Sequence, residues 1–314
     1  MSSTAGSIYG SNGLTFYDIA IASSASITAG TNFNVEHNLT NNGGVIDASV
    51  GKIVFTGSSA GTINGSSGTY DLAQFDVNKA TSIAVTLSSN LTNATAVNVV
   101  SGILDLTDKT ISQNSGSSGT NQLAVYANAL LKIGSTNTLP AIGNYTLDSL
   151  STVEYYGGNQ TVSVAATYGN LTLSTGGTKL APSAITMKNN FTLSAATFDA
   201  ASYTHTVGGN WTMSSGTFSN QGTIVFNGTA VQGISSTGAF NNMTINKTSG
   251  YIDLATDVTA GGTVTFTLGK IYTNANKLIM GTGTVSGADQ STGWVNGNLQ
   301  KMLEQDPIFP GRLR

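Results

Sequence analysis

A phrase of four residues returns along this chain, and its spacing restricts the possible fold more than any other feature. An amide or carboxylate side chain opens the phrase, and apolar–Thr–apolar follows in its most regular copies, which start at Asn170, Asn190 and Asn210. Related phrases start at Asp18, Gln74 and Asn242. A turn residue followed by a short alternating strand, repeated at intervals of about 20 residues, is typical of β-strand coils that stack along an axis.

A second phrase recurs in a constant order with the first. It is a β-branched and aromatic strand that ends in glycine, at Gly57, Gly157 and Gly228. After each copy come a polar stretch and then a copy of the first phrase. We interpret the glycine as the residue that supplies a positive φ at a sharp corner. The shared order indicates internal duplication of a module of roughly 60 to 100 residues.

The regular period distinguishes between the two folds that short strands without helices allow. Residues 263–268 alternate apolar side chains with threonine, as a strand with one buried face does. Such strands build either a β-solenoid or a tandem of small β-sandwiches. The period favours the solenoid, because stacked coils place Asn above Asn and aromatic above aromatic at about 4.8 Å. We predict an all-β, right-handed parallel β-helix with coils of about 20–24 residues, with tandem small β-sandwiches as the alternative.

The repeat pattern also predicts the domain organisation. Residues 1–301 are expected to form a single β-solenoid domain built of internal repeats. Residues 302–314 contain the only two arginines and two of the four prolines of the chain. Proline cannot donate a hydrogen bond to a strand ladder. We therefore predict that 302–314 is a non-repeat tail that acts as a cap or a subunit contact.

The composition excludes several classes of function. Only 9% of the residues are charged, against about 25% in typical soluble proteins. The net charge is −3 and the basic residues are scattered, so no basic stripe is available to bind nucleic acid. No apolar run approaches the roughly 18 residues that would predict a membrane span. The chain has no cysteine, which excludes disulfides, thiolate metal sites and a cysteine nucleophile.

Titratable residues that could form a catalytic or metal site are few and dispersed. His37 and His205 lie far apart in the sequence, which argues against a shared metal or catalytic site, and we interpret both as exposed strand positions. The sequence therefore predicts neither a metal site nor a cofactor, and it predicts that the chain is not an enzyme.

The acidic residues are candidates for catalytic groups, because β-helices that cleave polysaccharides use pairs of carboxylates. They are Asp105 with Asp108, Asp253 with Asp257, and Glu154. We favour a role at turns and corners, where a short carboxylate bonds its own backbone.

Four aromatic residues are candidates for stacking on sugars: Tyr155, Tyr156, Trp211 and Trp294. For Trp211, which stands inside a copy of the first phrase, we favour a role in filling the core of the stack.

Three stretches of the chain resemble the β-strand-repeat segments of very large bacterial surface proteins, which are adhesin-like or filament-like chains. They are residues 240–250 (FNNMTINKTSG), 257–271 (DVTAGGTVTFTLGKI) and 292–301 (TGWVNGNLQK). The resemblance implies a structural or adhesive β-helix at the cell surface, with no catalytic residues to carry over.

The leading functional hypothesis is an extracellular or cell-surface structural protein, either a filament subunit or an adhesin stalk. Open strand edges at the ends of a solenoid can pair with another copy, so the expected partner is a homopolymer of the chain itself. Surface glycans are a second expected partner. The alternative is a carbohydrate-binding or polysaccharide-degrading β-helix. An acidic cleft with Asp105, Asp108 or Glu154 beside Tyr155 would support that alternative.

Overall fold

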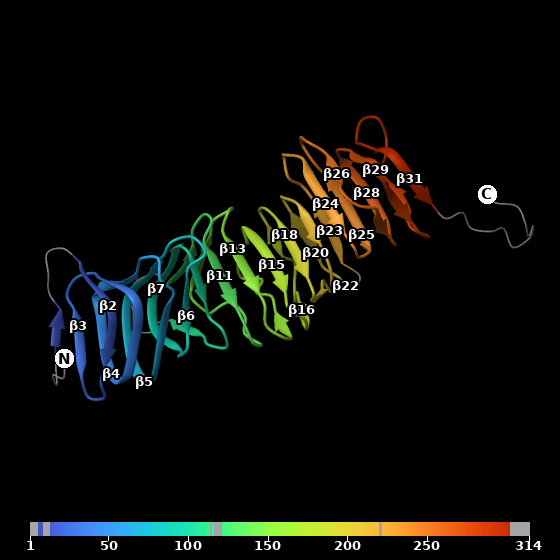
Figure 1. Ribbon diagram of the computed structural model, residues 1–314. Helices are drawn as coiled ribbons and strands as arrows, with labels where there is room; N and C mark the ends of the chain where they lie inside the picture. The colour runs from blue at the N-terminus through green and yellow to red at the C-terminus, as the bar shows by residue number, and fades with distance from the viewer. Residues whose placement is uncertain (1–5, 9–12, 114, 116–120, 220–221, 302–314) are drawn as a thin grey trace, which may run out of the picture. The chain divides into compact units, whose positions relative to one another are not determined.

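The chain folds as an all-β protein of stacked parallel strands (Figure 1). The computed structural model describes residues 6–8, 13–113, 115, 121–219 and 222–301, and no helix occurs among them. These residues form a β-solenoid of about 13 turns. The predicted β-helix is therefore confirmed, and the tandem of sandwiches is not what the chain forms. The right-handed winding stays a prediction from the handedness of parallel crossovers.

Two compact units make up the chain, Met1–Gly169 and Asn170–Arg314, and each is described by itself. The single solenoid domain over residues 1–301 stays a prediction, and the tail at 302–314 lies outside the described residues. The strands of the first unit are β1 (Gly6–Ile8), β2 (Leu14–Ile21), β3 (Ser26–Ala29), β4 (Phe33–Phe55), β5 (Gly61–Asn78), β6 (Ala84–Leu87), β7 (Leu91–Ser101), β8 (Ile103–Asp105), β9 (Ile111–Gln113), β10 (Gln122–Val125), β11 (Leu130–Ile133), β12 (Asn144–Leu147), β13 (Thr152–Tyr155) and β14 (Gln160–Thr161).

The strands of the second unit are shorter on average than those of the first. They are β15 (Asn170–Ser174), β16 (Thr178–Leu180), β17 (Thr186–Met187), β18 (Phe191–Ser194), β19 (Thr197–Asp199), β20 (Thr204–Val207), β21 (Trp211–Met213), β22 (Thr217–Ser219), β23 (Thr223–Phe226), β24 (Gln232–Ser236), β25 (Asn242–Asn246), β26 (Ile252–Leu254), β27 (Val258–Ala260), β28 (Thr263–Leu268), β29 (Ile271–Met280), β30 (Thr284–Ser286) and β31 (Val295–Lys301).

The sequence step between two paired residues measures the length of a coil. In the described pairings of the first unit, the step is as short as that from Leu14 to Phe33 and as long as that from Ile103 to Leu130. The second unit varies less, and its longest step runs from Ile271 to Val295. The predicted coil length of about 20–24 residues thus describes the second unit well, whereas loops widen some coils of the first unit.

The most regular copies of the first phrase stack directly on one another. Leu171 pairs with Phe191, and Phe191 pairs with Trp211, so each copy lies one coil from the next. The Phe191 and Trp211 rings are buried and stack with their centroids 4.3 Å apart. The ring of Trp211 also lies 5.0 Å from that of Phe240. The predicted aromatic stack is confirmed, and Trp211 fills the core.

The asparagines that open these phrases form a ladder of hydrogen bonds at one corner of the coil. The backbone N–H of Asn190 donates to Oδ1 of Asn170 (3.2 Å), and that of Asn210 donates to Oδ1 of Asn190 (2.8 Å). Gly233 continues the ladder by donating its N–H to Asn210 (2.7 Å). Each side chain thus satisfies a backbone N–H of the next coil where the backbone turns away from a regular strand. The predicted Asn-over-Asn register is correct, but the bonds join side chain to backbone.

The two phrases of the sequence occupy the same position in successive coils. In the first unit, Ile53 of the second phrase pairs with Phe75 of the first phrase. In the second unit, Ile224 pairs with Met243 in the same way. All four side chains are fully buried. The internal duplication is therefore a direct consequence of stacking, because a strand and the strand above it share one environment.

The glycines that end the second phrase have two different physical roles. Gly57 has the expected positive φ, +84°. Gly157 and Gly228 do not, but a Cβ there would collide with the carbonyl oxygens of Ser135 and Gly208 one coil below. For these two glycines the expected positive φ is wrong, and close backbone approach is the reason for glycine.

The asparagine ladder can be tested at Asn190. We expect Asn190→Ala to lower the free energy of unfolding by about 1 kcal/mol, because the N–H of Asn210 loses its acceptor. Asn190→Asp keeps an acceptor and should cost less, as Asp257 already accepts from the N–H of Lys277 at another corner (2.9 Å). Urea titration followed by circular dichroism measures both. Equal losses in the two variants would contradict the role of the ladder.

Candidate functional site

His37 is the more exposed of the two histidines, and it forms a pair with an acidic residue. Its Nδ1 lies 2.9 Å from Oδ1 of Asp18. The ring also stacks on Tyr17, with centroids 4.8 Å apart. No group of three or more His, Asp or Glu side chains that could hold a metal ion occurs in the part of the chain that the structure describes. His37 thus belongs to a surface contact between neighbouring coils.

His205 is fully buried, so its interpretation as an exposed strand position is wrong. Its Nδ1 accepts a hydrogen bond from the N–H of Ile185 (3.2 Å), and its Nε2 lies 2.9 Å from the carbonyl oxygen of Ala200. Nδ1 must carry no proton to accept, so Nε2 carries the proton and donates. The Phe198 ring packs at 5.5 Å. Burial lowers the pKa of His205, and the ring is a neutral part of the core.

Three candidate residues in the first unit lie close together on the outer face of adjacent strands. Lys132 pairs in register with Asp105 on one side and with Glu154 on the other. Its Nζ lies 3.4 Å from Oε2 of Glu154 and 4.7 Å from the centre of the Tyr156 ring. The Tyr156 hydroxyl donates to Oδ1 of Asp105 (2.7 Å). Burial first, and then Asp105, raise the pKa of Tyr156, which therefore remains a donor at neutral pH.

Tyr155 is separated from this acidic group. It is fully buried, and its hydroxyl lies 2.9 Å from that of Tyr168. The arrangement that would support a polysaccharide-cleaving site, an acidic residue beside Tyr155 in one groove, is therefore not found among the described residues. Tyr156, its neighbour in the sequence, is the aromatic that contacts the acidic group.

The remaining acidic candidates take part in local or inter-coil bonds. Asp105 also accepts from the N–H of Thr107 (3.0 Å), which confirms the turn role expected for it. Asp108 pairs with Lys109 (2.8 Å), and this hydrogen bond lowers the pKa of Asp108. Asp253 accepts from the side chain of Asn274 on the neighbouring strand. Asp257 bonds the backbone of the next coil, as described above, rather than its own.

Sequence reasoning missed that Lys179 is buried, and it missed two further buried lysines, Lys79 and Lys247. Each of the latter two follows an asparagine directly after a copy of the first phrase, and this repeated Asn–Lys pair was the available signal. The Lys79 ammonium donates to the carbonyl oxygens of Glu36 (2.6 Å) and Thr56 (2.5 Å). Burial lowers its pKa.

Lys247 has three oxygen acceptors inside the coil. Its Nζ donates to the carbonyls of Gly228 (2.5 Å) and Ala230 (2.9 Å) and to Oε1 of Gln232 (2.8 Å). Burial lowers the pKa of Lys247 to about 8, so the group stays an ammonium at pH 7. An ammonium has three N–H donors, and all of them are used here. Lys247 therefore holds the corner together and has no bond left to offer a ligand.

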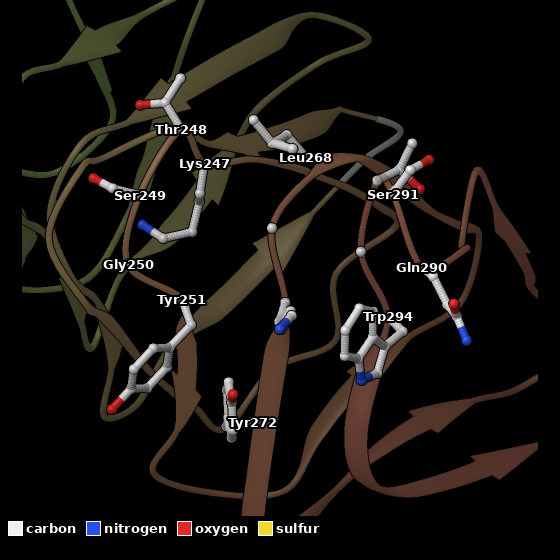
Figure 2. A pocket seen from close by; sticks show the side chains of 14 residues that line it. Lys247, Thr248, Ser249, Gly250, Tyr251, Leu268, Tyr272, Gln290, Ser291 and Trp294 are labelled. Atoms are coloured by element: carbon white, nitrogen blue, oxygen red, sulfur yellow. The ribbon is translucent and has the colours of Figure 1, made fainter.

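A hollow of about 280 Å³ opens beside Lys247 in the second unit (Figure 2). Three connecting segments line it: residues 247–251 before β26, 268–272 at the start of β29, and 290–294 before β31. Tyr251, Tyr272 and Trp294 stand along one side of it in Figure 2. The volume is near the lower end, about 300 Å³, of small-molecule sites.

The aromatic residues of the hollow differ from the aromatics of the core. Tyr251 and Trp294 keep 37% and 36% of their surface exposed, whereas Trp211 keeps 1%. The Tyr251 and Tyr272 rings contact each other with centroids 4.5 Å apart. Of the four aromatics that the sequence offered for sugar stacking, Trp294 is the one that the structure places in a hollow.

Comparisons with known proteins do not assign a family. No protein-family model, no curated protein and no solved structure matches the chain. Among the described residues there is no helix with the length and hydrophobicity to cross a bilayer.

The buried histidine predicts how stability depends on pH. An unfolded histidine, with a pKa of about 6.5, binds a proton before the buried His205 does. The contribution of the neutral ring is therefore complete above pH 6.5 and is lost as the pH falls through the lowered pKa of the folded state. We expect His205→Gln, which keeps one donor and one acceptor, to flatten the fall of the urea midpoint between pH 7.5 and pH 5.5. A wild-type slope in the variant would contradict this assignment.

Proposed function

We propose that the chain is a structural solenoid that associates end to end with further copies of itself. The observation that carries this proposal is the open end of the apolar core. Leu299 of β31 pairs in register with Leu278 of β29, so both side chains face the inside of the coil. Leu278 is fully buried, whereas Leu299 keeps 46% of its surface exposed. Among the described residues no further coil covers Leu299.

Neighbouring inward positions of the last coil repeat this pattern. Val295 of β31 lies in register with the buried Ile271, and Val285 of β30 with the buried Val264. Val295 and Val285 themselves are only half-buried. Within the described residues, β31 pairs with β29 alone and β30 with β28 alone, which leaves one edge of each strand without a partner.

The start of the first unit offers a matching surface. Leu14 of β2 pairs with Phe33 of β4, which is 1% exposed, while Leu14 itself keeps 39% of its surface exposed. In the described residues β2 pairs with β4 alone. On the same strand Phe16 is half-buried, and Ile19 and Ile21 are buried, so the exposed apolar surface of this end is centred on Leu14. Both strand edges accept the same kind of partner, a further parallel coil.

Contact between two unlike ends is heterologous, so it does not close and continues into a filament. Covering one leucine fully contributes about 1.5–3 kcal/mol, and the strand edges add hydrogen bonds. The second copy is the occupant that fits best, because it supplies parallel strands whose inward side chains alternate with the same spacing.

We also propose an extracellular or cell-surface location, which suits the role of a filament subunit or adhesin stalk. The low content of charged residues, the absence of cysteine and the resemblance to repeats of bacterial surface proteins favour it. A structural role also fits the fold, because a stack of parallel coils is extended by adding coils and requires no catalytic group.

End-to-end association can be tested with Leu299→Lys in the full chain. A lysine at this inward edge position should weaken association about tenfold to a hundredfold, because an ammonium would have to be buried against the next coil. Leu150→Lys is the matched control, because Leu150 is 51% exposed in the turn before β13 and belongs to neither end strand. Sedimentation velocity over a concentration series, with negative-stain images, measures the polymer.

We expect filaments or a concentration-dependent ladder of oligomers for the wild type and the Leu150 variant, and the Leu299 variant should need a concentration about ten to a hundred times higher to form them. A wild-type chain that stays monomeric at its highest soluble concentration would overturn the proposal. So would polymers of equal stability in the Leu299 variant, since association would then use another surface.

A further inference from the structure

The hollow at the end of the second unit has the features of a binding site, and end-to-end association does not use them. Three of its residues occupy equivalent corner positions in successive coils. Tyr251, Lys270 and Trp294 each stand directly before a strand, and the first residues of those strands, Ile252, Ile271 and Val295, pair in register. Lys270 therefore stands one coil from each aromatic residue. Tyr251 and Trp294 are two coils, or about 10 Å, apart.

Tyr251 and Trp294 expose apolar ring faces to solvent, at corner positions that polar residues could also occupy. Elsewhere in the second unit Phe191, Phe198 and Phe226 are buried and fill the stack. Tyr251 and Trp294 add nothing comparable to that core, because each keeps more than a third of its surface exposed. Exposed aromatics next to a hollow are the side chains that stack on flat apolar faces of ligands while their polar atoms stay in water.

The charged side chains that line the hollow are both lysines, while Asp289 beside it accepts hydrogen bonds from Ser291 and Thr292 of the lining. The two lysines are Lys247 and Lys270, and no aspartate or glutamate is among the lining residues. The three N–H donors of Lys247 are all used by its three acceptors. Lys270 differs, because its Nζ lies 4.1 Å from the centre of the Trp294 ring and donates to no acceptor among the described residues. A cation over an aromatic face retains free N–H donors for an incoming anion.

We propose that this hollow binds an acidic saccharide, through one sugar residue that carries a carboxylate. The C–H face of a pyranose ring lies against the exposed aromatic rings, and its carboxylate pairs with the ammonium of Lys270. The site matches both parts of this ligand. A neutral sugar would leave the N–H donors of Lys270 unused, and a plain carboxylate would leave the aromatic faces in water. On a structural solenoid, such a site attaches the polymer to an acidic polysaccharide.

The test measures binding of oligogalacturonate to the full chain, and it uses the Leu299→Lys background so that assembly does not interfere. The comparison ligands are neutral malto-oligosaccharide of the same length and poly-L-glutamate. Calorimetry gives the affinity, and fluorescence reports the site, because Trp294 is exposed whereas the other tryptophan, Trp211, is buried. We expect oligogalacturonate to bind at least about tenfold more tightly than either comparison ligand, and its affinity to fall with salt.

Two substitutions separate the contributions of stacking and charge. Trp294→Ala should lower the affinity at least about tenfold and abolish the fluorescence change. Lys270→Gln should remove the preference for the acidic over the neutral saccharide. The matched controls are Tyr203→Ala, which removes an aromatic that is 40% exposed in the same unit, and Lys277→Gln, which removes an exposed charge from β29, the strand that follows Lys270. Both controls should bind as the parent chain does.

Three results would overturn the proposal: no binding of oligogalacturonate to a folded parent chain, equal affinity for poly-L-glutamate, or unchanged affinity in Trp294→Ala. If Trp294→Ala fails to fold, Trp294→Phe, which keeps an aromatic face, replaces it in the binding measurements. Sedimentation of Trp294→Ala in the otherwise wild-type chain reports assembly independently, so failure of this proposal and failure of end-to-end association give different outcomes.

Discussion

The hydrogen bonds between successive parallel coils are the interaction on which each unit depends. Strand segments satisfy these bonds automatically, but corners do not, because the backbone turns there and its N–H and C=O groups lose their regular partners. At the corners, side chains provide hydrogen-bond partners for these backbone groups. Asn170 and Asn190 accept from backbone N–H groups of the next coil, and the Lys247 ammonium bonds inward-facing carbonyl oxygens. Among the buried charged groups, Lys79 and Lys247 bond backbone carbonyl oxygens, whereas Asp76 lies within strand β5 and pairs with Lys52.

A stack of this kind has two places for function, its ends and its outer corners. The ends repeat the chemistry of the interior, so Leu14 and Leu299 present apolar surface that the next coil would bury. The outer corners vary from coil to coil, because they lie outside the core. At the asparagine corners the polar groups bond one another, as the Asn210 N–H and the Asn190 side chain do. The corner at Tyr251, Lys270 and Trp294 differs, since its aromatic faces and its cation remain accessible.

Much of the fold could be predicted from the residues, and the errors have identifiable causes. The regular spacing of the first phrase predicted the register, because identical side chains stack only when coils are equally long. His205 was misread because histidine is usually exposed, although it shares one strand face with the buried Val207, and the alternation itself points inward. Trp294 could be named as a candidate from the sequence. Its neighbours in the hollow could not, because Tyr251 and Lys270 reach it only through the register of three coils.

The sequence by itself determined the strand period, the all-β class and the inward or outward direction of most side chains, since these follow from local alternation and from the distance between copies of one phrase. Only the tertiary structure decided which corners meet, which glycines need space rather than a positive φ, and where polar groups are buried. These properties depend on loop lengths between strands, and a loop that is longer by a few residues changes which corner residues lie side by side without changing the strand pattern. For that reason the architecture could be predicted from the sequence, whereas the hollow beside Trp294 could not.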